Sequence, residues 1–274
     1  HRRGTFGRHV ETFDLLRSDG QVRRCSVSEN AAMFGATIGG MGLTGIILRA
    51  TIRLMPVASL DVAERIDPFG SLGAFFDMAE AADADNEYAV AWIDQLAGIR
   101  KAGRGLLLTG NHAEGGSREV GVAGGRLAVP FQPPLNVLNR PFLKAFNFAY
   151  RTAKGHKRGV SRTGYQGFFF PLDGVRDWNR LYGPNGLFQH QSVVPFATAR
   201  AAIPTMFDAA RKAGQGSFLT VLKRFGDMPS PGILSFPRPG YTLTLDFPNR
   251  GAATLSLLET LDRIAIEAGG AVNP

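Results

Sequence analysis

The chain has 274 residues, of which 44% are hydrophobic and 20% charged, a composition typical of globular protein with one large or two smaller domains. Lys and Arg outnumber Asp and Glu by 31 to 23, so the formal net charge of +8 fits either an anionic partner or a solvated basic surface. No arginine-rich arm and no zinc-ligand spacing occur, so we predict neither a nucleic-acid partner nor a metal site. The single cysteine, Cys25, excludes an internal disulfide and is expected to pack in a core. No apolar stretch approaches the roughly 18 residues that a membrane-spanning helix needs.

The first elements predict a β-hairpin and a short helix. Residues 9–26 alternate apolar and polar side chains around a turn at Ser18-Asp19-Gly20, which is typical of a hairpin. Ser28 is expected to cap a helix that ends at Ala36.

A glycine-rich loop follows, from Gly39 to Gly45. Four glycines in seven positions let the backbone turn tightly and lie against a flat or anionic ligand, although such a turn alone is a weak signal. Residues 46–54 then alternate as a strand, and the small residues after Pro56 predict a domain boundary near 56–60.

The rest of the chain mixes helix and strand signals. The expected helices span residues 71–84, 197–213 and 252–268, and the expected strands span residues 88–94, 187–195, 218–225 and 241–245. Pro204 predicts a kink or a later start for the second helix, and Leu255 is expected on the core face of the third. Residues 109–165 show little periodicity and predict long irregular loops, mobile or gated by a ligand.

Three of these strands each have a face with polar side chains, because residues two apart share a face. Lys223 falls in the apolar row of residues 218–225, where it needs an anionic or polar partner unless it lies exposed on Phe225. Gln189 shares a face with Gln191 in the strand 187–195, and His190 points the other way. Such a sheet suits a hydroxyl-rich ligand, or simply has one solvated face.

From the two ends of the sequence we expect that the chain is an internal piece of a longer protein. The first residue is His1 rather than Met, and Gly269-Gly270 followed by Ala271 predicts a helix stop and the start of another strand.

Several motifs resemble those of a known family. The first group resembles the FAD-binding half of the vanillyl-alcohol-oxidase superfamily: Gly4-Thr5-Phe6-Gly7, Phe13-Asp14-Leu15-Leu16, Gly39-Gly40-Met41-Gly42-Leu43-Thr44-Gly45 and Arg49-Ala50-Thr51-Ile52. The second group resembles the bacterial decaprenylphosphoryl-β-D-ribose 2′-oxidase family: Ala91-Trp92-Ile93-Asp94, Pro171-Leu172-Asp173, Trp178-Asn179-Arg180-Leu181-Tyr182-Gly183-Pro184, Gln189-His190-Gln191, Leu222-Lys223 and Asp246-Phe247-Pro248. The similarity runs nearly end to end and is weakest between about 109 and 165.

The resemblance implies an FAD-dependent oxidoreductase of α+β fold. Residues 1–58 would be the later part of a PCMH-type FAD-binding domain, and residues 59–274 a truncated substrate domain with an antiparallel sheet flanked by helices. The reaction would remove a hydride to flavin N5 and oxidise a sugar hydroxyl, C2′ of a polyprenylphosphoryl pentose, to a ketone for cell-wall biosynthesis. A partner reductase would complete an epimerisation. The implied location is the cytoplasm or the inner face of the plasma membrane, with peripheral membrane contact.

The resemblance also implies roles for single residues. The cofactor-binding positions would be Ile47, Gly39, Gly40, Gly42, Thr44 and Asn273, the last standing where relatives have a tyrosine. Lys223 would be catalytic and hold the hydroxyl or the phosphate. The other substrate-binding positions would be Gln189, Trp92, Thr242, Thr244, Leu219, Val221, Phe225, Arg180 and Leu172. Thr242 and Thr244 replace an asparagine and a cysteine, so thiol trapping is lost. In the family, an FAD pyrophosphate loop and a flavin-side histidine precede residue 1, and a pocket lysine follows residue 274.

Each assignment has a structural alternative. Trp92 could be a core residue, and Arg180 could form an ion pair with Asp173 or Asp177. Two functional alternatives also remain: an FAD-dependent oxidase of a soluble alditol or aldose, and a non-catalytic binding module with a degraded flavin site.

Overall fold

The structure is a computed structural model that describes residues 3–97, 103–119, 127–134, 137–156 and 159–273. The chain forms two compact units, one made of His1–Pro56 with Phe225–Gly240 and the other of Val57–Arg224 with Tyr241–Pro274. The boundary predicted at residue 58 lies beside the observed one. The sequence predicted that residues 225–240 belong to the second unit, but they fold with the first. Ile233 shows why, because its backbone N–H donates to the Gly35 carbonyl at 2.9 Å across nearly the whole sequence, where no local pattern could signal it.

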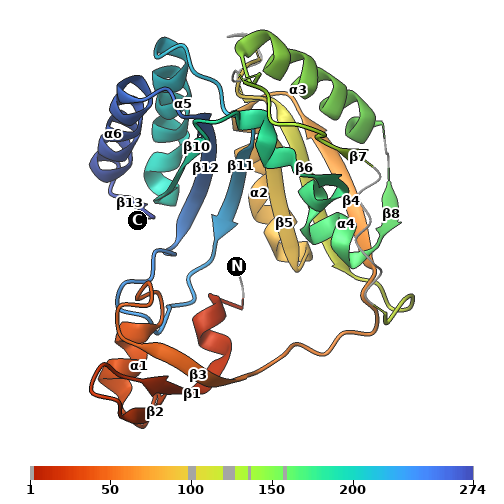
Figure 1. Ribbon diagram of the computed structural model, residues 1–274. Helices are drawn as coiled ribbons and strands as arrows, with labels where there is room; N and C mark the ends of the chain where they lie inside the picture. The colour runs from red at the N-terminus through yellow and green to blue at the C-terminus, as the bar shows by residue number, and fades with distance from the viewer. Residues whose placement is uncertain (1–2, 98–102, 120–126, 135–136, 157–158, 274) are drawn as a thin grey trace. The chain divides into compact units, whose positions relative to one another are not determined.

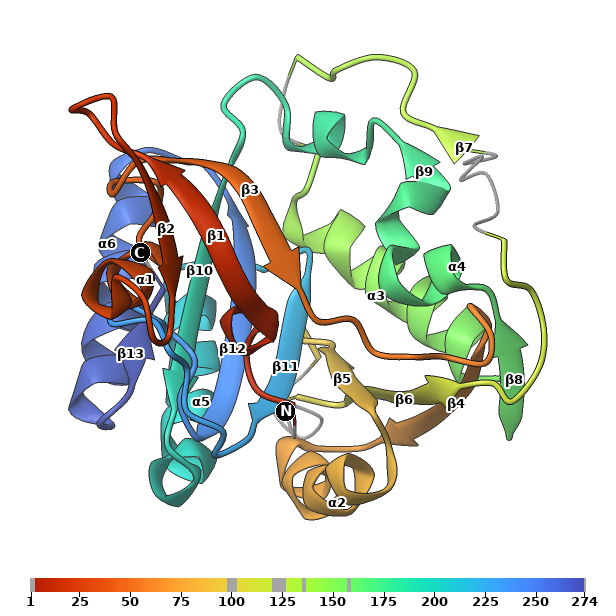
Figure 2. The same ribbon diagram turned by 90° about the horizontal axis from the view of Figure 1, so that it is seen from below.

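The first unit is a three-stranded sheet with one helix on it. Its elements are η1 (Phe6–His9), β1 (Val10–Leu16), β2 (Val22–Ser26), α1 (Ala31–Thr37) and β3 (Ile46–Ile52). The strand order is β2-β1-β3, and both pairings are antiparallel (Figure 2). Phe13 stacks on Phe34 of α1 with ring centroids 5.2 Å apart, beside Leu15 and Cys25. The predicted hairpin and the packing role of Cys25 are thus confirmed.

The predicted cap of α1 is wrong. Asn30 precedes the helix in a left-handed conformation, and α1 begins only at Ala31. The Ser28 backbone N–H instead donates to Ser26 Oγ at 3.2 Å, so the Ser26 side chain closes a turn between β2 and the helix.

The second unit is built on an eight-stranded sheet in the order β13-β10-β12-β11-β5-β6-β4-β8. Its strands are β4 (Val62–Phe69), β5 (Tyr88–Ile93), β6 (Gly105–His112), β8 (Val160–Thr163), β10 (Leu187–Val194), β11 (Thr220–Phe225), β12 (Gly240–Pro248) and β13 (Ala271–Val272). β7 (Leu127–Ala128) and β9 (Val175–Arg176) form a separate parallel pair. Its described helices are α2 (Leu72–Asp85), α3 (Arg140–Gly155), α4 (Tyr165–Phe169), α5 (Phe196–Lys212) and α6 (Ala252–Glu267), together with the short 3₁₀ helices η3 (Pro171–Gly174) and η4 (Trp178–Tyr182). The mixed helix and sheet with a large antiparallel sheet confirm the α+β class.

Helices cover both faces of this sheet (Figures 1 and 2). On one face, α2, α5 and α6 bury the main core, to which the sheet contributes side chains such as Ala91, Leu222 and Leu243. On the other face, α3 and α4 contact β4, and α3 also contacts β6. The residues of β10, β11 and β12 that alternate with the core side chains therefore form the opposite face of the sheet.

Three sequence predictions in the second unit are corrected. Residues 109–165 contain the helix α3 and are not irregular throughout; apolar side chains on both sides of α3 blur the pattern of a core-facing helix. α5 begins at Phe196 and continues through Pro204, so the later start is wrong, and the alternative of a kink at Pro204 stays a prediction. Leu255 of α6 is 47% exposed, whereas Leu257 and Leu261 face the core.

In the part of the chain that the structure describes, every helix is too short or too polar to cross a bilayer.

His190 lies in the core, on the face of β10 opposite the neighbouring glutamines, as predicted. Its side chain is 2% exposed, and its Nε2 lies 3.0 Å from Oδ1 of Asp262 on α6. Burial lowers the pKa of His190 from its ordinary value of 6.5, and the Asp262 carboxylate opposes that shift. The folded protein therefore resists a proton that the unfolded chain accepts.

We expect the free energy of unfolding to fall as pH drops through 6.5, with this histidine adding a slope of at most about 1.4 kcal/mol per pH unit. Above that pH the contribution of His190 is fully present. His190→Gln removes the slope, and His156→Gln, at an exposed histidine, keeps it. Urea unfolding of the three proteins from about pH 8 to about pH 5.5 measures the difference. Equal pH dependence in wild type and His190→Gln would show that this histidine does not titrate as described.

Candidate functional site

The glycine loop of the first unit folds in a way that only glycine permits at several positions. Gly39, Gly42 and Gly45 have φ values of +73°, +76° and +147°. A Cβ on Gly40 would lie 2.1 Å from the Ala36 carbonyl oxygen, and one on Gly45 would lie 2.4 Å from that of Leu16. The chain's own backbone therefore requires these residues to be glycine.

Gly42 differs from its neighbours because the chain leaves space beside it. A Cβ on Gly42 would meet no atom of the residues that the structure describes within 4 Å. The adjacent Met41 is a non-glycine residue at a φ of +54°, so the loop holds a strained turn around this open position. Strain of this kind is found at ligand sites more often than elsewhere.

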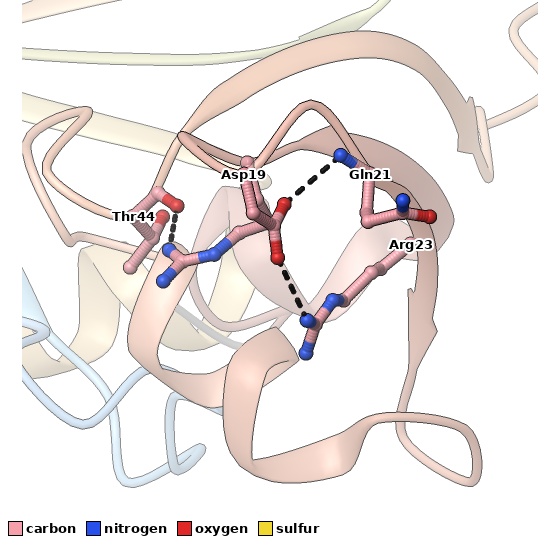
Figure 3. A network of polar contacts seen from close by, with 5 residues as sticks. Asp19, Gln21, Arg23 and Thr44 are labelled. Atoms are coloured by element: carbon pink, nitrogen blue, oxygen red, sulfur yellow. Dashed lines mark hydrogen bonds and ion pairs between the residues drawn. The ribbon is translucent and has the colours of Figure 1, made fainter.

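Polar contacts anchor the loop at its end. Thr44 Oγ1 lies 2.9 Å from Thr37 Oγ1 of α1, and the Thr44 carbonyl accepts a hydrogen bond from the Arg17 guanidinium. Figure 3 shows Thr44 beside the hairpin turn, in which Asp19 accepts from the Gln21 backbone N–H at 2.9 Å. This hydrogen bond is the main reason that the pKa of Asp19 is lowered, and an ion pair at 3.1 Å with Arg23 adds to it. The contacts hold the loop against the β1–β2 turn.

The loop and the strand after it expose large apolar side chains. β3 is an edge strand, and all seven of its residues are exposed. Ile47 is 51% exposed and Leu43 is 85% exposed. Exposed apolar side chains beside the empty space at Gly42 are typical of a surface that a ligand or another part of the protein covers.

The second candidate site is a row of polar side chains on β10 and β12, which we call the polar row. Its members lie on the face of the sheet opposite the α5–α6 core: Gln189, Gln191, Thr242, Thr244 and Asp246. The register pairs Gln189 with Asp246 and Gln191 with Thr244, so predicted residues from two strands meet here.

Hydrogen bonds link the members of the polar row. Gln189 Nε2 donates to Asp246 Oδ1 at 2.8 Å, and Gln191 Nε2 donates to Thr242 Oγ1 at 3.2 Å. Asn273, predicted as a cofactor contact, donates its side-chain amide to Gln191 Oε1 at 3.3 Å and its backbone N–H to the Gln191 carbonyl at 2.8 Å. The structure thus places Asn273 at the end of the polar row.

Asp246 and Tyr182 are site residues that the sequence analysis missed. Asp246 is 3% exposed, and burial raises the pKa of its carboxyl above the ordinary 3.8. Tyr182 is 1% exposed, its hydroxyl has no hydrogen-bond partner among the described residues, and burial together with the nearby Asp246 charge raises its pKa. The alternation Thr242, Thr244, Asp246 would have revealed the aspartate if the predicted strand had not ended at residue 245.

Lys223 lies on the same face of the sheet. In β11 it alternates with the core residue Leu222, and Val221 two positions before it is paired with Trp92. Solvent reaches the Lys223 side chain, yet the surrounding protein lowers the pKa of its ammonium by desolvation. An ammonium in this state gains more from an anionic or hydroxyl partner than a fully hydrated one would.

The remaining predicted residues have mainly structural contacts. Trp92 is buried against Ile66, Leu106 and the Tyr150 ring, so its described contacts match the core alternative. Arg180 forms an ion pair with Asp177 at 3.3 Å and donates to the Val129 carbonyl at 2.9 Å, which matches the structural alternative for that arginine.

The last three predicted residues have few described contacts with the polar row or the glycine loop. Leu219 packs in a small core with Tyr182, Leu172 lies half-buried in η3, and Phe225 contacts Phe236 in the first unit. A ligand role for each of these stays a prediction.

Asp246 gives a pH test of this site. Because its pKa is raised in the folded protein, the fold binds a proton more readily than the unfolded chain, and the free energy of unfolding attributable to Asp246 rises as pH falls toward 3.8. Asp246→Asn keeps the Gln189 hydrogen bond possible and should remove this rise. Asp208→Asn on the exposed part of α5 is the control. Chemical unfolding at about pH 7 and about pH 4.5 measures the difference. An unchanged pH dependence in Asp246→Asn would contradict the raised pKa.

Comparisons with known proteins now place the chain in a family. It is 33% identical to the decaprenylphosphoryl-β-D-ribose oxidase of Mycolicibacterium smegmatis over 98% of the chain and 60% of that protein. It is 32% identical to an uncharacterized Streptomyces coelicolor protein of the mprA 5′ region, over 99% of the chain and 76% of that protein. A stretch of 48 residues is 44% identical to cytokinin dehydrogenase 5 of Arabidopsis thaliana and covers 18% of the chain and 9% of that protein. A search against family models finds no match.

These similarities confirm the resemblance seen in the sequence, to a family of FAD-linked oxidases. The chain belongs to the family that includes the M. smegmatis oxidase and the S. coelicolor protein. It spans 60% of the length of the former and 76% of the latter.

Proposed function

We propose that the chain is part of an FAD-dependent oxidoreductase that oxidises a sugar hydroxyl to a ketone. The observation that carries the proposal is the similarity over 98% of the chain to a decaprenylphosphoryl-β-D-ribose oxidase. The partial similarity to a cytokinin dehydrogenase supports the same broad class.

The glycine loop suits a flat cofactor. Space beside Gly42, fixed glycines on either side and exposed apolar residues such as Ile47 offer a surface on which an isoalloxazine ring can lie without meeting a side chain. When bound, FAD would supply the hydride acceptor. Gly39, Gly40, Gly42, Thr44 and Ile47 would hold the ring, and Arg17 would fix the loop through the Thr44 carbonyl.

The polar row suits a sugar. Gln189 is exposed and offers an amide to hydroxyl groups, and the Asp246 carboxylate, which accepts from Gln189, would hold that amide in place. Lys223 on the neighbouring strand would hold a hydroxyl or a phosphate by a charge-assisted hydrogen bond. Domain roles follow: the first unit would bind the cofactor, and the second unit would bind the sugar.

The finer substrate that we propose is a polyprenyl-phosphate-linked pentose, oxidised at C2′. The ketone would pass to a separate reductase, so that the two steps together invert the configuration at C2′. The basic balance of the chain suits a phosphate-bearing substrate at the inner face of the plasma membrane.

The test is flavin reduction in the purified full-length protein without oxygen. We expect a yellow protein that is bleached rapidly by a polyprenylphosphoryl pentose and much more slowly by free ribose or an alditol. Equal bleaching by the free sugars would favour the soluble-sugar alternative instead. A colourless protein that cannot be loaded with FAD would favour the binding module.

A further inference from the structure

The outer face of α3 is unusually apolar for a helix that faces solvent. Phe148 is 67% exposed and Phe142 is 38% exposed. Ala145 and Ala149 lie between them on the same side of the helix and are also exposed. The apolar surface therefore runs along the helix rather than at a single point.

The inner face of α3 holds the helix in place. Leu143 is buried in a small core, and Asn147 donates its side-chain amide to Asp94 Oδ1 at 2.8 Å. Asp94 in turn pairs with Arg104 at 2.8 Å, and Tyr150 packs on Trp92 with ring centroids 4.9 Å apart. Because these contacts fix the inner side of α3, the helix cannot rotate to bury Phe148 without breaking them.

Basic side chains line one edge of this apolar face. Arg140, Lys144 and Lys154 recur at helical spacing along the same side of α3, with Lys144 exposed and the other two half-buried. Within the described residues, neither Lys144 nor Lys154 forms an ion pair. In the sequence, residues 120–172 contain eight Lys and Arg and no Asp or Glu, so this segment carries a charge equal to the net +8 of the chain.

We propose that the outer face of α3 is a docking surface for a bilayer that contains anionic lipids. Exposed phenylalanines beside a basic edge are the features by which a helix lies in the interface of such a membrane, with the rings among the acyl chains and the cations at the headgroups. The absence of acidic residues from 120 to 172 favours an anionic partner over a neutral one. This deepens the proposed function, on which the choice of a membrane rests, by naming the surface that would meet the bilayer. Vesicle binding is measured without turnover, so the two proposals can fail separately.

The test is flotation of the full-length protein with vesicles of phosphatidylglycerol or of phosphatidylcholine alone. We expect binding to the anionic vesicles that weakens as salt rises. Lys144→Glu should lower the partition coefficient by at least about fivefold, because each basic residue near the surface adds roughly 1 kcal/mol of attraction and the new carboxylate adds repulsion. Phe142→Ser with Phe148→Ser should lower it by a similar or larger factor.

Matched variants on other helices are the controls. Lys212→Glu changes the same charge on α5, and Leu255→Ser with Ile266→Ser removes two exposed apolar side chains from α6. Both should bind vesicles as the wild type does. Equal losses in these controls, or binding that ignores lipid charge, would overturn the proposal.

A fluorescent reporter shows which partner covers the face. Cys25 is the only cysteine and is buried, so Cys25→Ser with Phe148→Cys allows an environment-sensitive dye to be attached at one place. We expect a blue shift of the dye when anionic vesicles are added. A dye that is already shielded in the full-length protein without vesicles would show that protein covers this face, and would overturn the proposal.

Discussion

Replacing Lys223 by alanine is expected to lower kcat/KM for the sugar substrate about a hundredfold, while the full-length protein keeps its flavin. The Lys223 side chain lies on the sheet face that carries the polar row, and desolvation by the surrounding protein lowers the pKa of its ammonium. Loss of a hydrogen bond from a charged group to the substrate costs about 1.5–3 kcal/mol, which corresponds to this factor. Flavin content by absorption and steady-state kinetics on the same preparations give the two readings.

Two further variants sharpen this test. Lys223→Arg keeps the positive charge but replaces the ammonium by a planar guanidinium. Partial activity would therefore show that the charge matters more than the geometry of the hydrogen-bond donor. Lys212→Ala on α5 is the control for removing an exposed lysine. Unchanged kcat/KM in Lys223→Ala would remove this residue from the site and leave the family assignment intact.

Replacing Gly42 by valine is expected to abolish flavin binding. The Gly42 backbone has a φ of +76°, which a β-branched residue adopts only with strain of about 1–2 kcal/mol. Among the described residues, no atom lies within 4 Å of the added Cβ, so the valine would fill the space that we assign to the flavin. The reading is the flavin-to-protein ratio after purification and after incubation with excess FAD.

The variant Gly20→Val distinguishes the effect of backbone strain from the loss of space for the flavin. Gly20 has the same φ of +76° and the same empty surroundings, but it lies in the β1–β2 turn. Gly20→Val should therefore be destabilised to a similar extent and still bind flavin. If both variants lose flavin together, strain alone explains the loss, and a Gly42→Val protein with normal flavin would contradict the loop assignment.

Local patterns predicted the elements that depend on local physics. The hairpin of β1 and β2 and the helix α2, capped by the Ser71 side chain, follow from alternation, turn residues and capping. The opposite orientations of His190 and Gln189 follow from the period of a strand. These features need no knowledge of distant residues.

What the sequence did not predict depends on contacts between distant residues. Residues 225–240 join the first unit through contacts such as that of Ile233 with Gly35. α3 escaped detection because half of its apolar side chains face outward, which blurs the pattern of a core-facing helix. Tyr182 reaches the neighbourhood of Asp246 only through the packing of η4 against Phe218.

The central claim is that a flavin ring lies beside Gly42, and an experimental structure of the full-length protein with FAD bound tests it most directly. We expect the isoalloxazine in van der Waals contact with the backbone of residues 39–45. A structure in which the FAD lies away from this loop, or in which this loop packs against protein alone, would contradict the claim.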